Sequence, residues 1–135
     1  MTAGFALQKA IYETLAADPG LKALIGDPAR LHDGRPETAV YPFVSFGDAR
    51  ETRVQGADAL AEHDIRLSVH SRYDGRREIA EISERIIAAL EAAPPAPAGF
   101  RLVSLAHVST EVFRRADIDA HQGLIRLRAA TERLA

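Results

Sequence analysis

The beginning of the chain carries apolar residues at helical spacing. Leu7, Ile11 and Leu15 stand four positions apart, so they share one face of a helix predicted from Ala3 to Ala17. Thr2 precedes that helix and can cap its free N–H groups. The pattern therefore predicts an amphipathic helix whose apolar stripe packs against a core.

A second, short helix and two strands are predicted next. Asp18 followed by Pro19 is typical of a helix start, and Gly26 of a helix end. A stretch rich in Pro, Gly and Asp follows, with a short strand indicated near Arg30–His32. The apolar run Tyr41–Phe46 then predicts a buried strand.

Residues 48–61 are mostly polar and include Gly56. This composition indicates a strand that continues into a long exposed hairpin, or else a mobile loop. We expect disorder there in the isolated subunit.

The segment Glu62–Arg72 has the clearest strand pattern. Ile65, Leu67 and Val69 alternate with polar residues, which is the period of a strand with one face on a core. The polar residues between and beside them are Asp64, Arg66, Ser68, His70 and Arg72. We therefore expect the second face to meet water or a partner.

A helix and a hairpin are predicted for the C-terminal half. Asp74 can cap the helix, which runs to Ala93 and is ended by Pro94 and the prolines after it. Its apolar stripe consists of Ile79, Ile82, Ile86 and Leu90. Two strands follow at about Arg101–Arg114 and Gln122–Glu132, joined by a polar turn, and the pair is typical of an antiparallel hairpin.

The order of these elements predicts an α+β fold. We expect an antiparallel or mixed β-sheet with two main helices packed on one face, in a single domain over residues 1–135. A chain of 135 residues with 47% hydrophobic content can bury one core and is too short for two.

Composition excludes several classes of function. The net charge of -2 gives no global positive field for nucleic acid or an anionic membrane. The absence of Cys excludes disulfides, thiolate metal sites and Cys nucleophiles, and fits a reducing cytoplasm. We find neither a signal-peptide pattern nor an apolar run long enough for a membrane span, so we expect no membrane association.

The ionisable residues predict no catalytic, cofactor or metal site. The five histidines are His32, His63, His70, His107 and His121. None pair at the spacing of a helical zinc motif, and His63 and His70 would point to opposite faces of one strand. Asp117 and Asp119 could bind a cation or act as acid and base, but turns commonly use Asp for local backbone hydrogen bonds, and we favour that role. No phosphate-binding glycine loop or nucleophile elbow occurs.

Four segments together carry a resemblance to a known family. They are LAADPGLKALIG at Leu15–Gly26, ARLHDGRPETAVYPFVSFGDA at Ala29–Ala49, HDIRLSVHSRYDGRREIAEISERIIAAL at His63–Leu90 and FRRADIDAHQGLIRLRAATE at Phe113–Glu132. Over nearly the whole chain, the sequence resembles the tail terminator, or tail completion, proteins of long-tailed bacteriophages and gene transfer agents. One departure is His70, where the family pattern implies an aromatic residue, often Trp.

The resemblance implies a non-enzymatic structural protein. Such proteins form a hexameric ring of identical subunits that caps the head-proximal end of the tail tube. The ring stops tube growth and joins the tail to a head-side stopper or connector, so the partners are the tail tube protein and that stopper. DNA would pass through without specific binding. The protein would lie in the bacterial host cytoplasm during assembly and then in the tail neck, of either a phage or a gene transfer agent.

Charged residues are the candidates for protein–protein contacts. The predicted interface residues are Arg50, Glu51, Arg53, Asp58, Glu62, Arg72, Arg76 and Arg77. We expect the segment Asp48–Ala61 to contact another ring, because exposed polar hairpins commonly serve interfaces. The densest basic cluster consists of Arg72, Arg76 and Arg77, and Arg126 with Arg128 forms another. We expect these arginines to pair with carboxylates of a neighbouring subunit rather than with nucleic acid.

Two other functions remain open at this point. Another head–tail joining or minor tail component could share the same α+β fold, because fold alone does not fix function. A small ligand-binding or enzymatic α+β domain would need ionisable residues that converge in a pocket, and the sequence offers no such set.

Overall fold

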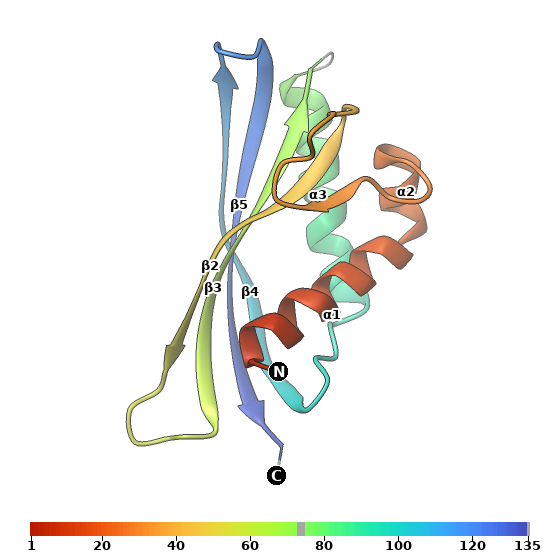
Figure 1. Ribbon diagram of the computed structural model, residues 1–135. Coiled ribbons are helices and arrows are strands. Elements are labelled where there is room, and N and C mark those ends of the chain that lie inside the picture. Colours follow the sequence, from red (N-terminus) through yellow and green to blue (C-terminus); the bar gives the residue numbers. More distant parts are fainter. Residues whose placement is uncertain (73–74, 135) are drawn as a thin grey trace.

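The computed structural model describes residues 1–72 and 75–134. Within them lie three helices and five strands. In chain order these are α1 (Ala3–Ala17), α2 (Pro19–Ile25), β1 (Leu31–Asp33), β2 (Phe43–Arg53), β3 (Leu60–Ser71), α3 (Arg76–Ala92), β4 (Phe100–Arg115) and β5 (Ala120–Arg133). The strands form one sheet in the order β1-β2-β3-β5-β4, with all three helices on one side of it (Figure 1). The predicted α+β class, with a mixed sheet, is confirmed.

Two side-chain caps fix the N-terminal helices as the sequence predicts. Thr2 Oγ1 accepts a hydrogen bond from the N–H of Phe5 at 3.1 Å, and Asp18 Oδ2 accepts one from Leu21 at 2.8 Å. Asp18 also receives two hydrogen bonds from the guanidinium of Arg85 on α3, at 2.9 and 3.0 Å. The cap of α2 is thus also the link between α2 and α3.

The sheet is mixed because β1 alone pairs in parallel. Leu31 of β1 lies beside Val44 of β2, and every other strand pair is antiparallel. The short β1 is one residue later than the predicted Arg30–His32. Since β2–β3, β3–β5 and β5–β4 are each antiparallel, β2 and β4 run in opposite directions at the two flanks of the sheet.

The core lies between the helices and one face of the sheet. Ile65, Leu67 and Val69 of β3 are buried there, as the alternation predicts. The apolar stripes of α1 and α3 close over them, including the fully buried Ile11 and Ile82. Alternation in β3 and the stripes of the two long helices therefore predicted the core correctly.

The segment Asp48–Ala61 is an ordered hairpin in this structure. Strand β2 continues to Arg53, and its last residues pair with the start of β3, for example Arg53 with Ala61. Only residues 54–59 form the connection, where Gly56 adopts a φ of +81° that suits a tight turn. The expected hairpin is confirmed, whereas the expected disorder is wrong for the part that pairs with β3.

Helix α3 was predicted to be capped by Asp74 and to run to Ala93. The helix begins at Arg76 and ends at Ala92, one residue before the predicted end. Asp74, the predicted cap, lies outside the described residues.

Candidate assembly interface

The face of the sheet without helices was expected to meet water or a partner, and at one end it does not. His70 is only 5% exposed because its ring stacks on Phe43, with ring centroids 4.3 Å apart and planes 12° apart. Ser45 completes the contact with a 2.9 Å hydrogen bond to His70 Nε2. The expectation of an exposed polar face is therefore wrong at His70. The stacked ring occupies the position where the family pattern implies an aromatic residue.

Burial changes the acid–base behaviour of two histidines. The pKa of His70 falls to about 4, mainly because burial disfavours the charged ring and secondarily because Arg35 and Arg115 are positive. On the opposite face, His63 bonds to Thr131 Oγ1 at 2.8 Å, and burial lowers its pKa despite the opposing effect of Glu51. The two histidines lie on opposite faces, as predicted, and neither is placed to share a metal.

Tyr41 extends the aromatic cluster toward solvent. Its ring lies 5.3 Å from Phe43, and the guanidinium of Arg72 lies 4.6 Å from its centroid. Arg72 also donates to the carbonyl of Ile118 at 3.2 Å, while Arg35 donates to the Tyr41 hydroxyl at 3.2 Å. Arg72, a predicted interface residue, thus holds the β4–β5 turn against this cluster and is exposed beside it.

Charged side chains occupy the middle of the same face. Asp64 accepts a hydrogen bond from Arg126 at 3.1 Å and lies opposite Arg50 and Arg128 in the sheet register. Arg66 stands directly across from Arg126, a like-charge arrangement that costs stability unless a carboxylate lies close. Arg126 Nε is buried and has no hydrogen-bond partner among the described residues.

Five of the eight predicted interface residues gather at the hairpin, but not on one face. Strand alternation places Arg50 and Glu62 on the uncovered face, and Glu51 and Arg53 on the helix side. Glu51 also accepts a hydrogen bond from the N–H of Gly4 at 3.0 Å, which ties the hairpin to α1. Asp58 is exposed in the connecting turn.

The other three predicted residues lie at the far end of β3. Strand β3 spans Leu60–Ser71, and at about 3.3 Å per residue its ends are roughly 40 Å apart. Arg72 follows its last residue, and Arg76 and Arg77 begin α3. Arg77 pairs with Glu81 at 3.2 Å on the exposed surface. The predicted set therefore marks two opposite ends of the molecule rather than one site (Figure 1).

The two flanks of the sheet are left without partners, and sequence reasoning located neither of them. Strand β1 pairs only with Val44–Phe46, so within the described residues Ala49–Arg53 of β2 has a partner on one side alone. Strand β4, along its whole length, likewise pairs with β5 alone among the strands of the described chain. The register shifts at Val103 and Val108, and both valines are 45% exposed.

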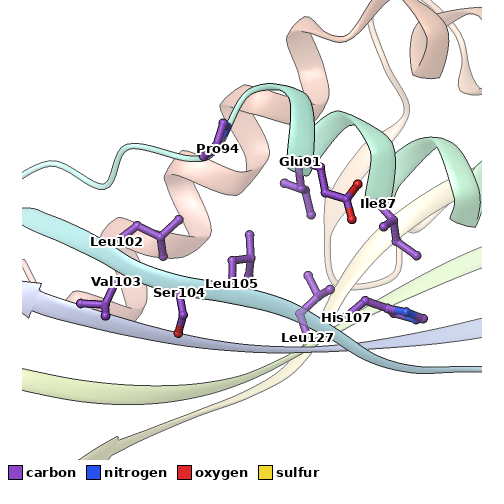
Figure 2. Close-up of a pocket in the computed structure, with 10 residues that line it drawn as sticks. Ile87, Glu91, Pro94, Leu102, Val103, Ser104, Leu105, His107 and Leu127 are labelled. Carbon is purple, nitrogen blue, oxygen red and sulfur yellow. The ribbon is translucent and has the colours of Figure 1, made fainter.

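A groove lies beside the β4 flank, where the helix layer stops short of the sheet edge. Figure 2 shows its walls: Ile87, Glu91 and Pro94 on one side, and Leu102, Leu105 and His107 of β4 on the other. Its volume is about 250 Å³, and Leu127 forms part of its floor. The predicted interface residues, which were chosen by charge, do not include this groove because its lining is mostly apolar and comes from separate elements.

The acidic residues and histidines of the described part of the chain do not converge on a metal site. No three His, Asp or Glu side chains there come close enough together to hold a metal ion. Asp117 and Asp119 form ion pairs with Arg115 and Arg114, each at 2.9 Å, in the β4–β5 turn. Their partners are local, but they are arginine side chains, whereas backbone hydrogen bonds were the expectation. None of the described helices is long and apolar enough to cross a membrane.

Comparison with known proteins identifies the family of the chain. The sequence profile of the family described as "Tail completion protein gp17" matches residues 9–132. The chain belongs to this tail completion family. Because members of this family are structural proteins of phage tails, the chain is a structural tail protein and not an enzyme. A search of curated protein sequences found no match.

The solved structures that are similar to the chain include two from phage-related particles. One, from the "virion of native gene transfer agent (GTA) particle", is 27% identical, covers 98% of this chain and 99% of its own, and has a TM-score of 0.81. The other, the "bacteriophage SPP1 gp17 protein", is 26% identical, with coverage of 94% and 89% and a TM-score of 0.64. The tail completion protein is accordingly a component of a phage or gene transfer agent tail, where it associates with other tail or head proteins.

Proposed function

We propose that this tail completion protein forms a ring, of six identical subunits, at the head-proximal end of the tail tube. The ring stops polymerisation of the tube and joins it to the head-side stopper. Membership of the tail completion family supports a role at this place in the particle. The observation that carries the ring is the pair of unpaired sheet edges on opposite flanks of the subunit.

The two unpaired edges suit a ring because one belongs to β4 and the other to β2, so the β4 edge of one subunit can pair with the β2 edge of the next. A closed ring needs two complementary surfaces on each subunit, related by a rotation. Strand β4 and the Ala49–Arg53 part of β2 run in opposite directions, so subunits that all point the same way would meet in antiparallel register. Pairing would also cover edges that otherwise promote aggregation.

The two charged ends suit the two axial faces of such a ring. We assign contacts with the tube to the hairpin, through Arg50, Arg53 and Asp58 in particular. Contacts with the stopper would then involve Arg72 and the start of α3, roughly 40 Å away. Because the net charge of the chain is -2, DNA would pass through the ring without the many phosphate contacts that produce tight binding.

Electron microscopy of particles made with and without the protein tests this function. We expect overlong tails, or tails detached from heads, when it is absent. Unchanged tail length and attachment would exclude the terminator role and favour another joining or minor tail component.

A second experiment tests the assignment of the hairpin to the tube. Deletion of Thr52–Ala59 shortens the hairpin, and the Arg53→Glu and Asp58→Arg variants alter its charge without shortening it. We expect uncapped, overlong tails from each, whereas the matched Arg76→Glu variant should leave tail length normal and weaken head attachment. Capped tails of normal length from the deletion would remove the hairpin from the tube contact.

A further inference from the structure

We propose that the groove between α3 and β4 receives α1 of a second copy of this chain, with the Phe5 side chain entering the groove. This inference rests on the proposed ring and names the surfaces that join its neighbouring subunits.

The groove is where the helix layer of one subunit is incomplete. Helix α3 packs mainly over β3 and β5 and less closely over β4. Leu102 and Leu105 of β4 point to the helix side of the sheet yet remain half-buried. Another helix placed beside α3 would complete the layer and cover them.

The edge of β4 next to the groove lacks two of the common protections against pairing, namely charged side chains and proline. Residues 102–110 contain no charged side chain other than the titratable His107, and no proline. The two shifts in register leave Val103 and Val108 exposed. Natural edge strands are commonly blocked by charge, proline or bulges. Here only the two register shifts interrupt the edge, and a stretch without charge or proline that exposes two valines is consistent with cover in the assembled state.

The opposite flank presents the matching helix. Phe5, Gln8 and Tyr12 follow one stripe of α1 at spacings of three and four. Phe5 is 62% exposed and Tyr12 is 42% exposed. Gln8, between them, donates to Asp33 of β1 at 3.3 Å, so the stripe lies on the β1–β2 side of the molecule. This side bears two aromatic side chains that the described part of the subunit leaves largely exposed.

The helix and the groove lie at the same level of the sheet. Leu105 is paired with Ala129, Ala129 with His63, and His63 with Glu51, in one row across four strands. Glu51 in turn accepts the hydrogen bond from Gly4, the residue before Phe5. If β2 of a second copy extends the sheet beyond β4 at this level, its Phe5 arrives opposite Leu105.

Charge at the rim agrees with this placement. Lys9 is exposed on α1 between Phe5 and Tyr12, and Glu91 is exposed at the mouth of the groove. Neither takes part in an ion pair within the described part of the chain. Docking of α1 would bring these opposite charges together.

Cross-linking in assembled particles tests the contact. Because the chain has no Cys, the double variant Phe5→Cys with Leu105→Cys introduces its only thiols. Treatment with a short bis-maleimide should give a ladder of covalent multimers that ends at the full ring. Each single variant should give no covalent multimers. Phe5→Cys with Glu81→Cys, on the solvent face of α3, is the matched control and should give no ladder.

A charge exchange gives a second test that does not depend on thiols. Lys9→Glu and Glu91→Lys should each reduce the fraction of capped tails, and the double variant should restore it. Both positions are exposed, so thermal unfolding of the subunit should not change.

The outcomes separate this inference from the proposed function. Overlong tails without the protein, but no ladder from the Phe5 and Leu105 thiols in rings that do form, would overturn the groove contact alone. Failure of the double charge variant to restore capping would also count against it. Normal tails without the protein would overturn the proposed function itself.

Discussion

The two faces of β3 share a backbone and differ in how they are stabilised. Toward the helices, Leu67 and Val69 are fully buried in an apolar core. On the other face, His70 is buried by an aromatic stack and a hydrogen bond, whereas Asp64 is only partly covered and is held by its ion pair with Arg126. The comparison teaches that an alternating strand can bury both faces over part of its length, and that the second face then depends on specific polar partners.

Truncation in the core should have the largest effect. Leu67→Ala removes a fully buried side chain and should lower the free energy of unfolding by about 2–5 kcal/mol, because it leaves a cavity. The adjacent Arg66→Ala, on the uncovered face, should cost no more than about 1 kcal/mol. Urea unfolding of both variants measures the difference, and equal losses would contradict the distinction between the faces.

Acid should weaken the uncovered face through His70. Its folded pKa of about 4 lies below its ordinary value of 6.5, so the folded state binds fewer protons between these two pH values. The stabilisation is complete above pH 6.5 and is lost as pH falls toward 4. At about 1.4 kcal/mol per pKa unit the loss amounts to at most about 3 kcal/mol.

His70→Gln provides the control for this pH dependence. Gln can still hydrogen-bond to Ser45 but cannot titrate. Unfolding midpoints measured between pH 7 and 4 should therefore fall less steeply in the variant. Some slope should remain because burial also lowers the pKa of His63. An unchanged slope would show that His70 does not sense pH in this range.

An added methyl group tests how closely α3 approaches the sheet. A Cβ at Gly123 would clash with Ile79 Cγ2 on α3. Gly123→Ala should therefore lower the free energy of unfolding by about 1–3 kcal/mol through overpacking. At Gly47 the nearest atom to such a Cβ is the Arg66 carbonyl oxygen at 3.4 Å, and Gly47→Ala should change stability by less than about 0.5 kcal/mol. Thermal unfolding of the two variants compares them directly, and equal shifts would argue against the close helix contact.

The smallest effect is expected from the partly exposed ion pair. The side chains of Asp64 and Arg126 are 30% and 33% exposed, so Asp64→Asn should cost about 1 kcal/mol or less. The loss should shrink as salt concentration rises, because Arg66 and Arg128 then repel Arg126 less. Glu62→Gln, without an ion pair in the described chain, is the matched control. A loss that is insensitive to salt would assign the effect to packing.

Sequence reasoning predicted the elements better than the candidate site. The stripes of α1 and α3, the caps at Thr2 and Asp18, and the alternation in β3 are local patterns, and the structure confirms them. The exposure of His70 was mispredicted because Phe43, which covers it, is distant in sequence and joins it only through strand pairing. The predicted interface residues remain a prediction, now divided between two ends of the molecule.

The sequence by itself determined where the helices and most of the strands lie, which of their faces are apolar, and that the chain resembles tail completion proteins. These properties follow from the spacing of side chains along one segment, which a helix or a strand converts directly into a face. Only the tertiary structure decided the strand order β1-β2-β3-β5-β4 and the unpaired flanks. It also placed the groove beside α3 and Phe5 at the level of Leu105. These features depend on contacts between distant segments, and no local pattern in the chain encodes which strand edge remains free.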